Sequence, residues 1–447
     1  FVRADLTDVS VTDCRADDTE FSESVFAGTV LRDSSLARAD LAGAVLADAT
    51  IEAVDCSGAS LQEAQLAGSE LADCSFAEAC LDRADLSGAD LSEGVLRYAS
   101  LVGADLSAAR LVDGDLREVD LADAVAVGAD LRRVALPKAV CCRADFTEAR
   151  LDHAALREAD LTDAVLTDAT APNANFVAAD LTGCRLDGAT LQAGVFREAL
   201  LAGARLSAAD FSGADLTGAD LYESTATGAA FDHARLADAD LSNATFDGSV
   251  LTEAVLTGAT LRRSTFEAVE LTAASLGGAD LHGVDLTAAT ADRALLQGAT
   301  LRAATLTDAG FQEADLSGAT LSEATLAGAD LREATLVEAV AVAADFTSAV
   351  LDMADCRRAD FTEAICWQTS FVGAMLADAV LTDAVVWRAD LRYSDLTGTA
   401  LAAVDAEDPA AAAFIWKADF DGATAQPPAG TPDTGAADET RLHPRPS

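Results

Sequence analysis

Carboxylates are the side chains whose number and spacing could carry chemistry in this chain. The sequence holds 75 Asp and Glu against 30 Lys and Arg, a net charge of −45. Many positions whose residue number is a multiple of 20 hold Asp or Glu, and none of these positions holds Lys or Arg. We call six of them the acidic stripe: Asp120, Asp160, Asp180, Asp220, Asp240 and Asp280.

These carboxylates lack the partners that catalysis requires. No cluster of His, Cys and Asp has metal-ligand spacing, and no phosphate-binding glycine loop or nucleophile elbow occurs. A repeat also places acids everywhere, so paired acids carry no catalytic information. The sequence therefore predicts a non-enzymatic protein without cofactor or metal, whose charge serves binding.

A five-residue repeat positions the acids. From Phe1 to Ala406, every fifth residue is Leu, Phe, Ile, Val, Ala or Cys, 82 positions without a slip. We call these positions centres. The residue two places before each centre is small, and the one between them is commonly Asp or Thr. Self-similarity of this length determines the fold.

The period of five excludes both regular elements. In an α-helix, successive centres would lie roughly 140° apart, and in a flat strand alternate centres would point to opposite faces. A chain that turns a corner every five residues keeps every centre inside. Glycines two places after the centre, such as Gly213 and Gly218, suit the positive φ of tight corners.

The unit Ala-Asp-Leu-x-x, as in Ala214-Asp215-Leu216, resembles the pentapeptide-repeat family. The resemblance covers roughly residues 1–406 and implies an all-β fold, a right-handed quadrilateral β-helix with four pentapeptides per coil. Phenylalanines 20 apart, such as Phe176 and Phe196, fit side chains stacked on successive coils. With about 4.8 Å between coils, about 20 coils would form a solenoid roughly 100 Å long.

The repeat defines the domain boundaries. Residues 1–406 are predicted as the β-helix. The register breaks there, and residues 407–421 are predicted as a short capping helix with Asp408 as N-cap and Pro409 in its first turn. Residues 422–447, rich in Pro and Gly, are predicted as a disordered tail. The chain begins at a centre without Met, so we expect an N-terminal truncation.

Cysteine usage indicates a reducing compartment. No C-x-x-C pair occurs, and Cys80 and Cys142 alone occupy outward positions. The other seven are predicted to be buried thiols: Cys14, Cys56, Cys74, Cys141, Cys184, Cys356 and Cys366. The sequence contains no run of 18 apolar residues, so no membrane-spanning segment is predicted. Arg outnumbers Lys 28 to 2, a bias found in GC-rich bacterial genes, so a cytoplasmic bacterial protein is expected.

Two clusters stand out from the repeat. The first is a group of basic residues, the basic island, which is either a partner contact or a solvated face that balances local acids. The second is a group of outward-facing apolar residues after residue 364, the apolar patch, which is either a cap on the last coil or a dimer contact. The basic island is Arg132, Arg133, Lys138 and Arg143, and the apolar patch is Ile365, Trp367, Val385, Trp387, Phe414 and Trp416.

The acidic stripe resembles the surface with which quinolone-resistance pentapeptide proteins imitate DNA and occupy the DNA site of gyrase. This resemblance implies a protein partner, such as a DNA-binding enzyme, and a homodimer through the C-terminal end. Direct nucleic-acid binding is not expected from so acidic a chain. The alternative interpretation is that Asp is the family consensus here and keeps the chain soluble.

Two further functions remain open at this level. The repeats could form a passive structural spacer within a larger protein. A threonine ladder could instead bind ice, because paired threonines occur on ice-binding β-helices, although Thr is also favoured on exposed strands. The ladder consists of Thr225, Thr245, Thr265, Thr305 and Thr325.

Overall fold

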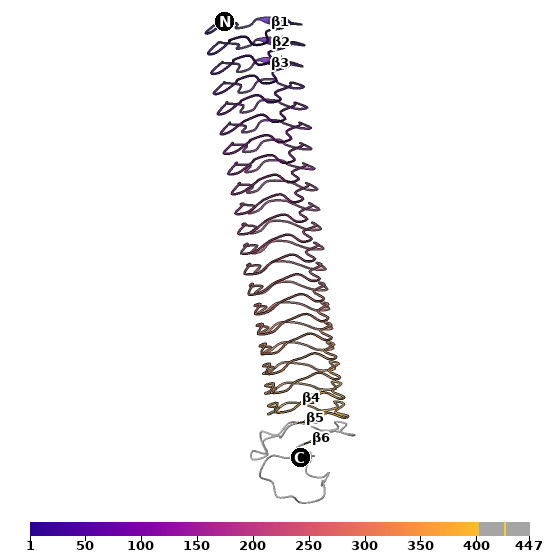
Figure 1. Cartoon of the computed structure of the whole chain (residues 1–447). Coiled ribbons are helices and arrows are strands. Elements are labelled where there is room, and N and C mark those ends of the chain that lie inside the picture. Colours follow the sequence, from indigo (N-terminus) through magenta and orange to yellow (C-terminus); the bar gives the residue numbers. More distant parts are fainter. Residues whose placement is uncertain (402–423, 426–447) are drawn as a thin grey trace, which may run out of the picture. The chain divides into compact units, whose positions relative to one another are not determined.

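The computed structural model describes residues 1–401 and 424–425, which fall into two compact units. The first unit is Phe1–Ala230 and the second is Phe231–Ser447. In each unit the chain winds through successive stacked coils (Figure 1). The predicted capping helix at 407–421 lies outside the described residues, which contain no helix.

Parallel pairing between residues 20 apart builds each unit. In the first unit, β1 (Ser10–Thr12), β2 (Val30–Arg32) and β3 (Thr50–Glu52) pair in that order. In the second, β4 (Val380–Leu381) pairs with β5 (Ala400–Leu401). Single bridges such as Asp160↔Asp180 continue the same spacing. The expected four pentapeptides per coil are therefore confirmed.

The pairing between β5 and β6 (Thr424–Ala425) has a different spacing. Ala400 pairs with Thr424, 24 residues away rather than 20. This change follows the break in the sequence repeat after Ala406. β6 lies inside the segment 422–447 that was predicted to be disordered, so at these two residues the prediction was wrong, because they pair with β5.

Each corner is a tight turn closed by backbone hydrogen bonds. The Ala164 N–H donates to the Leu161 carbonyl at 2.9 Å across one corner, while the Leu161 N–H donates to the Asp180 carbonyl of the next coil at 2.7 Å. The residue two after each centre has positive φ, whether it is Gly188 at 69° or Glu158 at 57°. Many corners thus hold a side chain in a conformation that usually favours glycine.

The centres and the small residues before them fill the interior. Leu161 and Ala159 have almost no exposed surface, as expected. Phe176 and Phe196 stack with ring centroids 4.7 Å apart, and Phe246 and Phe266 stack at 5.0 Å. Because the interior is packed with side chains, function must depend on the outer faces.

Candidate functional site

Each aspartate of the acidic stripe folds back onto its own corner. Asp160 Oδ1 accepts hydrogen bonds from the Thr162 N–H at 3.0 Å and the Thr162 hydroxyl at 2.6 Å. Asp180 Oδ1 accepts the Thr182 N–H at 2.9 Å. Asp120, Asp220, Asp240 and Asp280 accept the equivalent N–H at 2.9 to 3.1 Å. These carboxylates therefore stabilise the turns, a role that the sequence analysis missed.

Asp160 and Asp180 form the central pair of the stripe, and each uses only one carboxylate oxygen in its turn. Asp160 and Asp180 bridge adjacent coils, and among the described residues Oδ2 of each makes no hydrogen bond or ion pair. Asp280 differs, because Arg262 lies 2.7 Å from its Oδ2. Asp160 and Asp180 are therefore the strongest candidates in the stripe for contacting a cationic partner.

Apolar residues interrupt the acidic stripe. Val140 precedes Asp160 on the ladder and Leu200 follows Asp180, with exposed fractions of 37% and 43%. Asp220 ends the stripe in the first unit. In the second unit, Thr260 separates Asp240 from Asp280. Among the six, only Asp160 and Asp180 occupy adjacent coils of one unit.

Repulsion between stacked carboxylates would raise their pKa values, but in the described residues every clearly shifted carboxyl pKa is lowered. The Arg117 guanidinium, 2.7 Å from Asp115, lowers the pKa of that carboxyl to about 2 against the opposing effect of partial burial. Arg97 contacts the same carboxylate. Asp130, Asp330 and Asp355 have lowered pKa values because each binds the arginine two residues later. Ion pairing thus outweighs repulsion at these sites.

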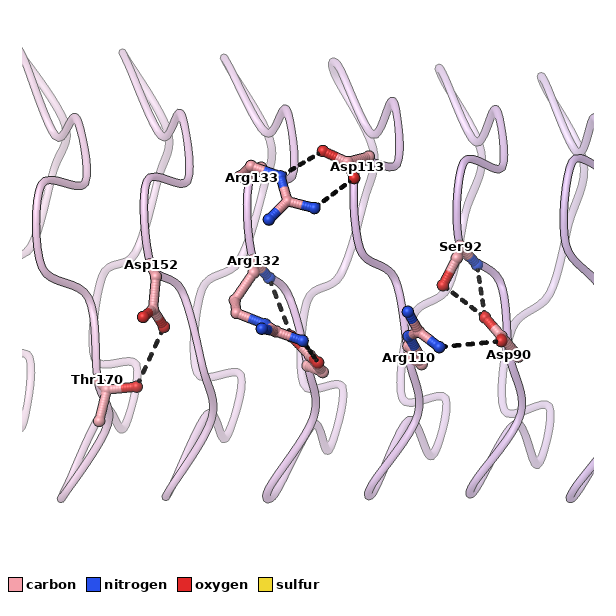
Figure 2. A network of polar contacts seen from close by, with 9 residues as sticks. Asp90, Ser92, Arg110, Asp113, Arg132, Arg133, Asp152 and Thr170 are labelled. Atoms are coloured by element: carbon pink, nitrogen blue, oxygen red, sulfur yellow. Dashed lines mark hydrogen bonds and ion pairs between the residues drawn. The ribbon is translucent and has the colours of Figure 1, made fainter.

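The basic island is paired residue by residue with acids. Arg133 lies 2.6 Å from Asp113 on the preceding coil, and Arg132 lies 2.6 Å from Asp130 (Figure 2). Arg143 pairs with Asp123 at 2.7 Å, and Lys138 lies 3.7 Å from Glu158. The geometry therefore favours a locally neutralised face over a free basic contact.

The apolar patch forms one exposed surface on two coils. Ile365 and Val385 bridge adjacent coils and are 42% and 48% exposed. The Trp367 and Trp387 rings, each 40% exposed, stack at 6.1 Å with 21° between their planes. The Arg388 guanidinium lies 5.8 Å from the Trp387 ring centre. Phe414 and Trp416 lie outside the described residues.

The threonine ladder is discontinuous. In the second unit Thr245 bridges Thr265 and Thr305 bridges Thr325, but Asp285 lies between the two pairs. Thr225 belongs to the first unit. A charged residue in the middle of the face breaks the regular hydroxyl array that this interpretation requires.

No arrangement for catalysis emerges from the described residues. They contain no group of three or more His, Cys, Asp and Glu side chains placed to hold a metal ion. They also contain no helix long and apolar enough to cross a membrane. Six cysteines are buried, as expected, whereas Cys14 is exposed because only one neighbouring coil covers the first coil. Its predicted burial was wrong.

Comparison with known proteins identifies one family. A sequence model described as "Pentapeptide repeats (8 copies)" matches overlapping segments that together cover most of residues 4–405, with the first at 4–41 and the last at 369–405. A search of curated proteins found no match.

Solved structures of pentapeptide-repeat proteins are also similar to this chain. HetL from the cyanobacterium Nostoc, involved in heterocyst differentiation regulation, is 32% identical, with 55% of this chain and 89% of HetL covered and a TM-score of 0.27. QnrB1, a plasmid-mediated fluoroquinolone resistance protein, is 25% identical, with 38% and 82% covered and a TM-score of 0.27. A thylakoid-lumen protein of Arabidopsis thaliana is 24% identical, with 28% and 65% covered and a TM-score of 0.16.

Proposed function

The chain belongs to the pentapeptide-repeat family, whose members form right-handed β-helices, and we propose that it is a non-enzymatic scaffold that binds a protein partner through its acidic face. The sharpest form of the proposal is mimicry of DNA toward a DNA-binding enzyme, such as the type II topoisomerase DNA gyrase. The supporting observation is the Asp160–Asp180 pair on adjacent coils, in which Oδ2 of each carboxylate has no hydrogen bond or ion pair among the described residues.

The density of charge supports mimicry. The chain carries a net charge of −45, most of it in the repeats. At the usual strand spacing, the charge of the repeats amounts to about one negative charge per 2.4 Å of stacked coils. Duplex DNA carries about one per 1.7 Å. A cationic DNA-binding groove would therefore attract this surface over a similar distance and with a similar dependence on salt.

Gyrase supercoiling in the presence of the intact protein tests the proposal. The protein is expected to inhibit the enzyme, and substitution of four stripe residues by Asn should weaken inhibition about tenfold or more because the charges that imitate phosphates are lost. The four substitutions are Asp160→Asn, Asp180→Asn, Asp220→Asn and Asp240→Asn.

The chain offers a matched control on another face. Four further aspartates occupy the same place in the repeat and accept the same turn hydrogen bond, so Asn at these positions removes equal charge from a different face. The control substitutions are Asp85→Asn, Asp105→Asn, Asp145→Asn and Asp345→Asn. Equal loss in both quadruple variants would show that net charge alone matters and would refute the stripe as the binding surface.

A passive spacer is the second candidate, because the stripe aspartates have a purely structural use in closing their turns. A spacer needs this hydrogen bond but no partner. No effect of the intact protein on gyrase or on a panel of DNA-binding enzymes would favour the spacer over the mimic.

A further inference from the structure

Charges of opposite sign border the apolar patch on its two edges. Glu363 and Asp383 occupy the corners before Ile365 and Val385, and Arg388 occupies the corner after Trp387. All three charged residues are exposed, and none forms an ion pair with another described residue. Most corner arginines elsewhere in the described residues pair with an acid on the adjacent coil, as Arg358 does with Glu338 at 2.9 Å.

We propose that this lateral face joins two copies of the chain in an isologous dimer, with the twofold axis parallel to the direction in which the coils stack. Rotation about this axis exchanges the two edges of the face, so Asp383 of each copy comes opposite Arg388 of the other. A twofold axis along the strands would instead place acidic edge against acidic edge. Charge complementarity therefore selects the first arrangement.

Burial of the tryptophans provides the attraction. Aromatic side chains and Arg dominate the energy of protein interfaces when they lose contact with water. The four described residues of the patch expose on the order of 300 Å², whereas a stable interface needs about 800 Å² from each partner. The same face continues toward the N-terminus through Asp345, which pairs with Ile365, to Thr325 and Thr305, so the area that extends the contact includes one carboxylate in each copy.

The high net charge gives this dimer a diagnostic salt dependence. Two copies that each carry −45 repel one another, and salt screens this long-range repulsion more effectively than a close, partly buried ion pair. Dimerisation should therefore strengthen when salt is raised from low to moderate concentration. The contact uses a lateral face, so it is distinct from the end-to-end dimer implied by the family resemblance and is independent of DNA mimicry.

Light scattering on the full-length chain over a concentration series tests the proposal. The wild type is expected to dimerise, and Trp367→Ser/Trp387→Ser to remain a monomer. Leu295→Ser is the control, because Leu295 is also exposed, at 43%, but lies on another face of the same unit. Circular dichroism of each variant verifies that the fold is retained.

A charge exchange tests the orientation. Asp383→Arg alone or Arg388→Asp alone should weaken dimerisation by about tenfold, and the double variant should restore it, because the two residues then pair in reverse. A monomeric wild type, dimers that ignore the Trp substitutions, or a double variant no better than either single one would overturn the proposal. A monomer whose patch becomes more accessible to solvent after Phe414→Ser/Trp416→Ser would assign the patch to the chain's own C-terminal residues instead.

Discussion

Asn175 holds its corner in the same way that Asp160 holds the corner three repeats earlier. Asn175 Oδ1 accepts the Val177 N–H at 3.0 Å, and Asp160 Oδ1 accepts the Thr162 N–H at the same distance. The turn therefore needs a short side chain with an acceptor oxygen and does not need a charge. Asp at this position can be exchanged for Asn to separate electrostatics from folding.

Asp160→Asn is expected to leave stability within about 0.5 kcal/mol of the wild type, since the turn hydrogen bond survives. Asp160→Ala should cost about 1 kcal/mol, because the Thr162 N–H and hydroxyl lose their acceptor. Thermal unfolding followed by circular dichroism compares the two variants. Equal melting temperatures would show that the hydrogen bond contributes nothing to the fold.

Asp115 should make stability sensitive to acid. Its pKa in the folded protein is about 2 against an ordinary value of 3.8, mainly because Arg117 binds the carboxylate. A carboxyl with a lowered folded pKa stabilises the fold above its unfolded pKa, and this contribution disappears as pH falls from about 4 to about 2. The full contribution is about 2 kcal/mol for this side chain, which is 22% exposed.

The test of this prediction is the melting temperature of the wild type and of Asp115→Asn as a function of pH. The substitution removes the ion pairs with Arg97 and Arg117 but can keep an acceptor at the turn. We expect the variant to melt below the wild type at pH 6 and the difference to vanish near pH 2. A difference that persists in strong acid would assign the effect to packing instead.

Phenylalanine centres such as Phe196 should be the core positions at which truncation of the side chain lowers stability most. The Phe196 ring lies 4.7 Å from Phe176 and 5.3 Å from Phe211, and it has no exposed surface. Phe196→Ala should cost about 3–5 kcal/mol through lost burial and a cavity. Phe196→Leu, which installs the commonest centre residue, should cost less than about 1.5 kcal/mol. Urea denaturation of both variants measures the difference, and similar losses would contradict a size-dependent core.

Thiol labelling should divide the cysteines into two groups. Burial raises the pKa of Cys74 to about 11 and of Cys366 to about 12, so both remain protonated and shielded at pH 8. Iodoacetamide should modify Cys14, Cys80 and Cys142 in the folded protein and all nine thiols in urea, as read by peptide mass spectrometry. Early modification of Cys366 would contradict its burial.

The interior could be predicted from the sequence because one rule repeats without interruption. A centre at every fifth residue allows only a chain that keeps turning, and the structure places Leu161 and Phe196 inside accordingly. Spacing alone could not give the number of turns per coil, which came from the family resemblance. The exposure of Cys14 was missed because burial also depends on neighbouring coils.

The surface was predicted less completely, because side chains there have several available partners. Arg133 and Asp113 are separated by 20 residues, so their ion pair could have been found from the repeat. The hydrogen bond from the Thr162 N–H to Asp160 is local and could not be distinguished from a solvent-facing carboxylate by periodicity. The alternatives for the apolar patch stayed open because period and composition do not specify what covers a face.

Val140 and Leu200 affect where a molecule can bind along the acidic stripe. A perfectly repetitive ladder of charge would look the same after a shift of one coil, so a bound molecule could slide along it between equivalent positions. The apolar side chains that flank the pair, Val140 before Asp160 and Leu200 after Asp180, remove that equivalence. They therefore allow a bound molecule to recognise one position on the ladder, the Asp160–Asp180 pair, rather than any pair of stacked carboxylates.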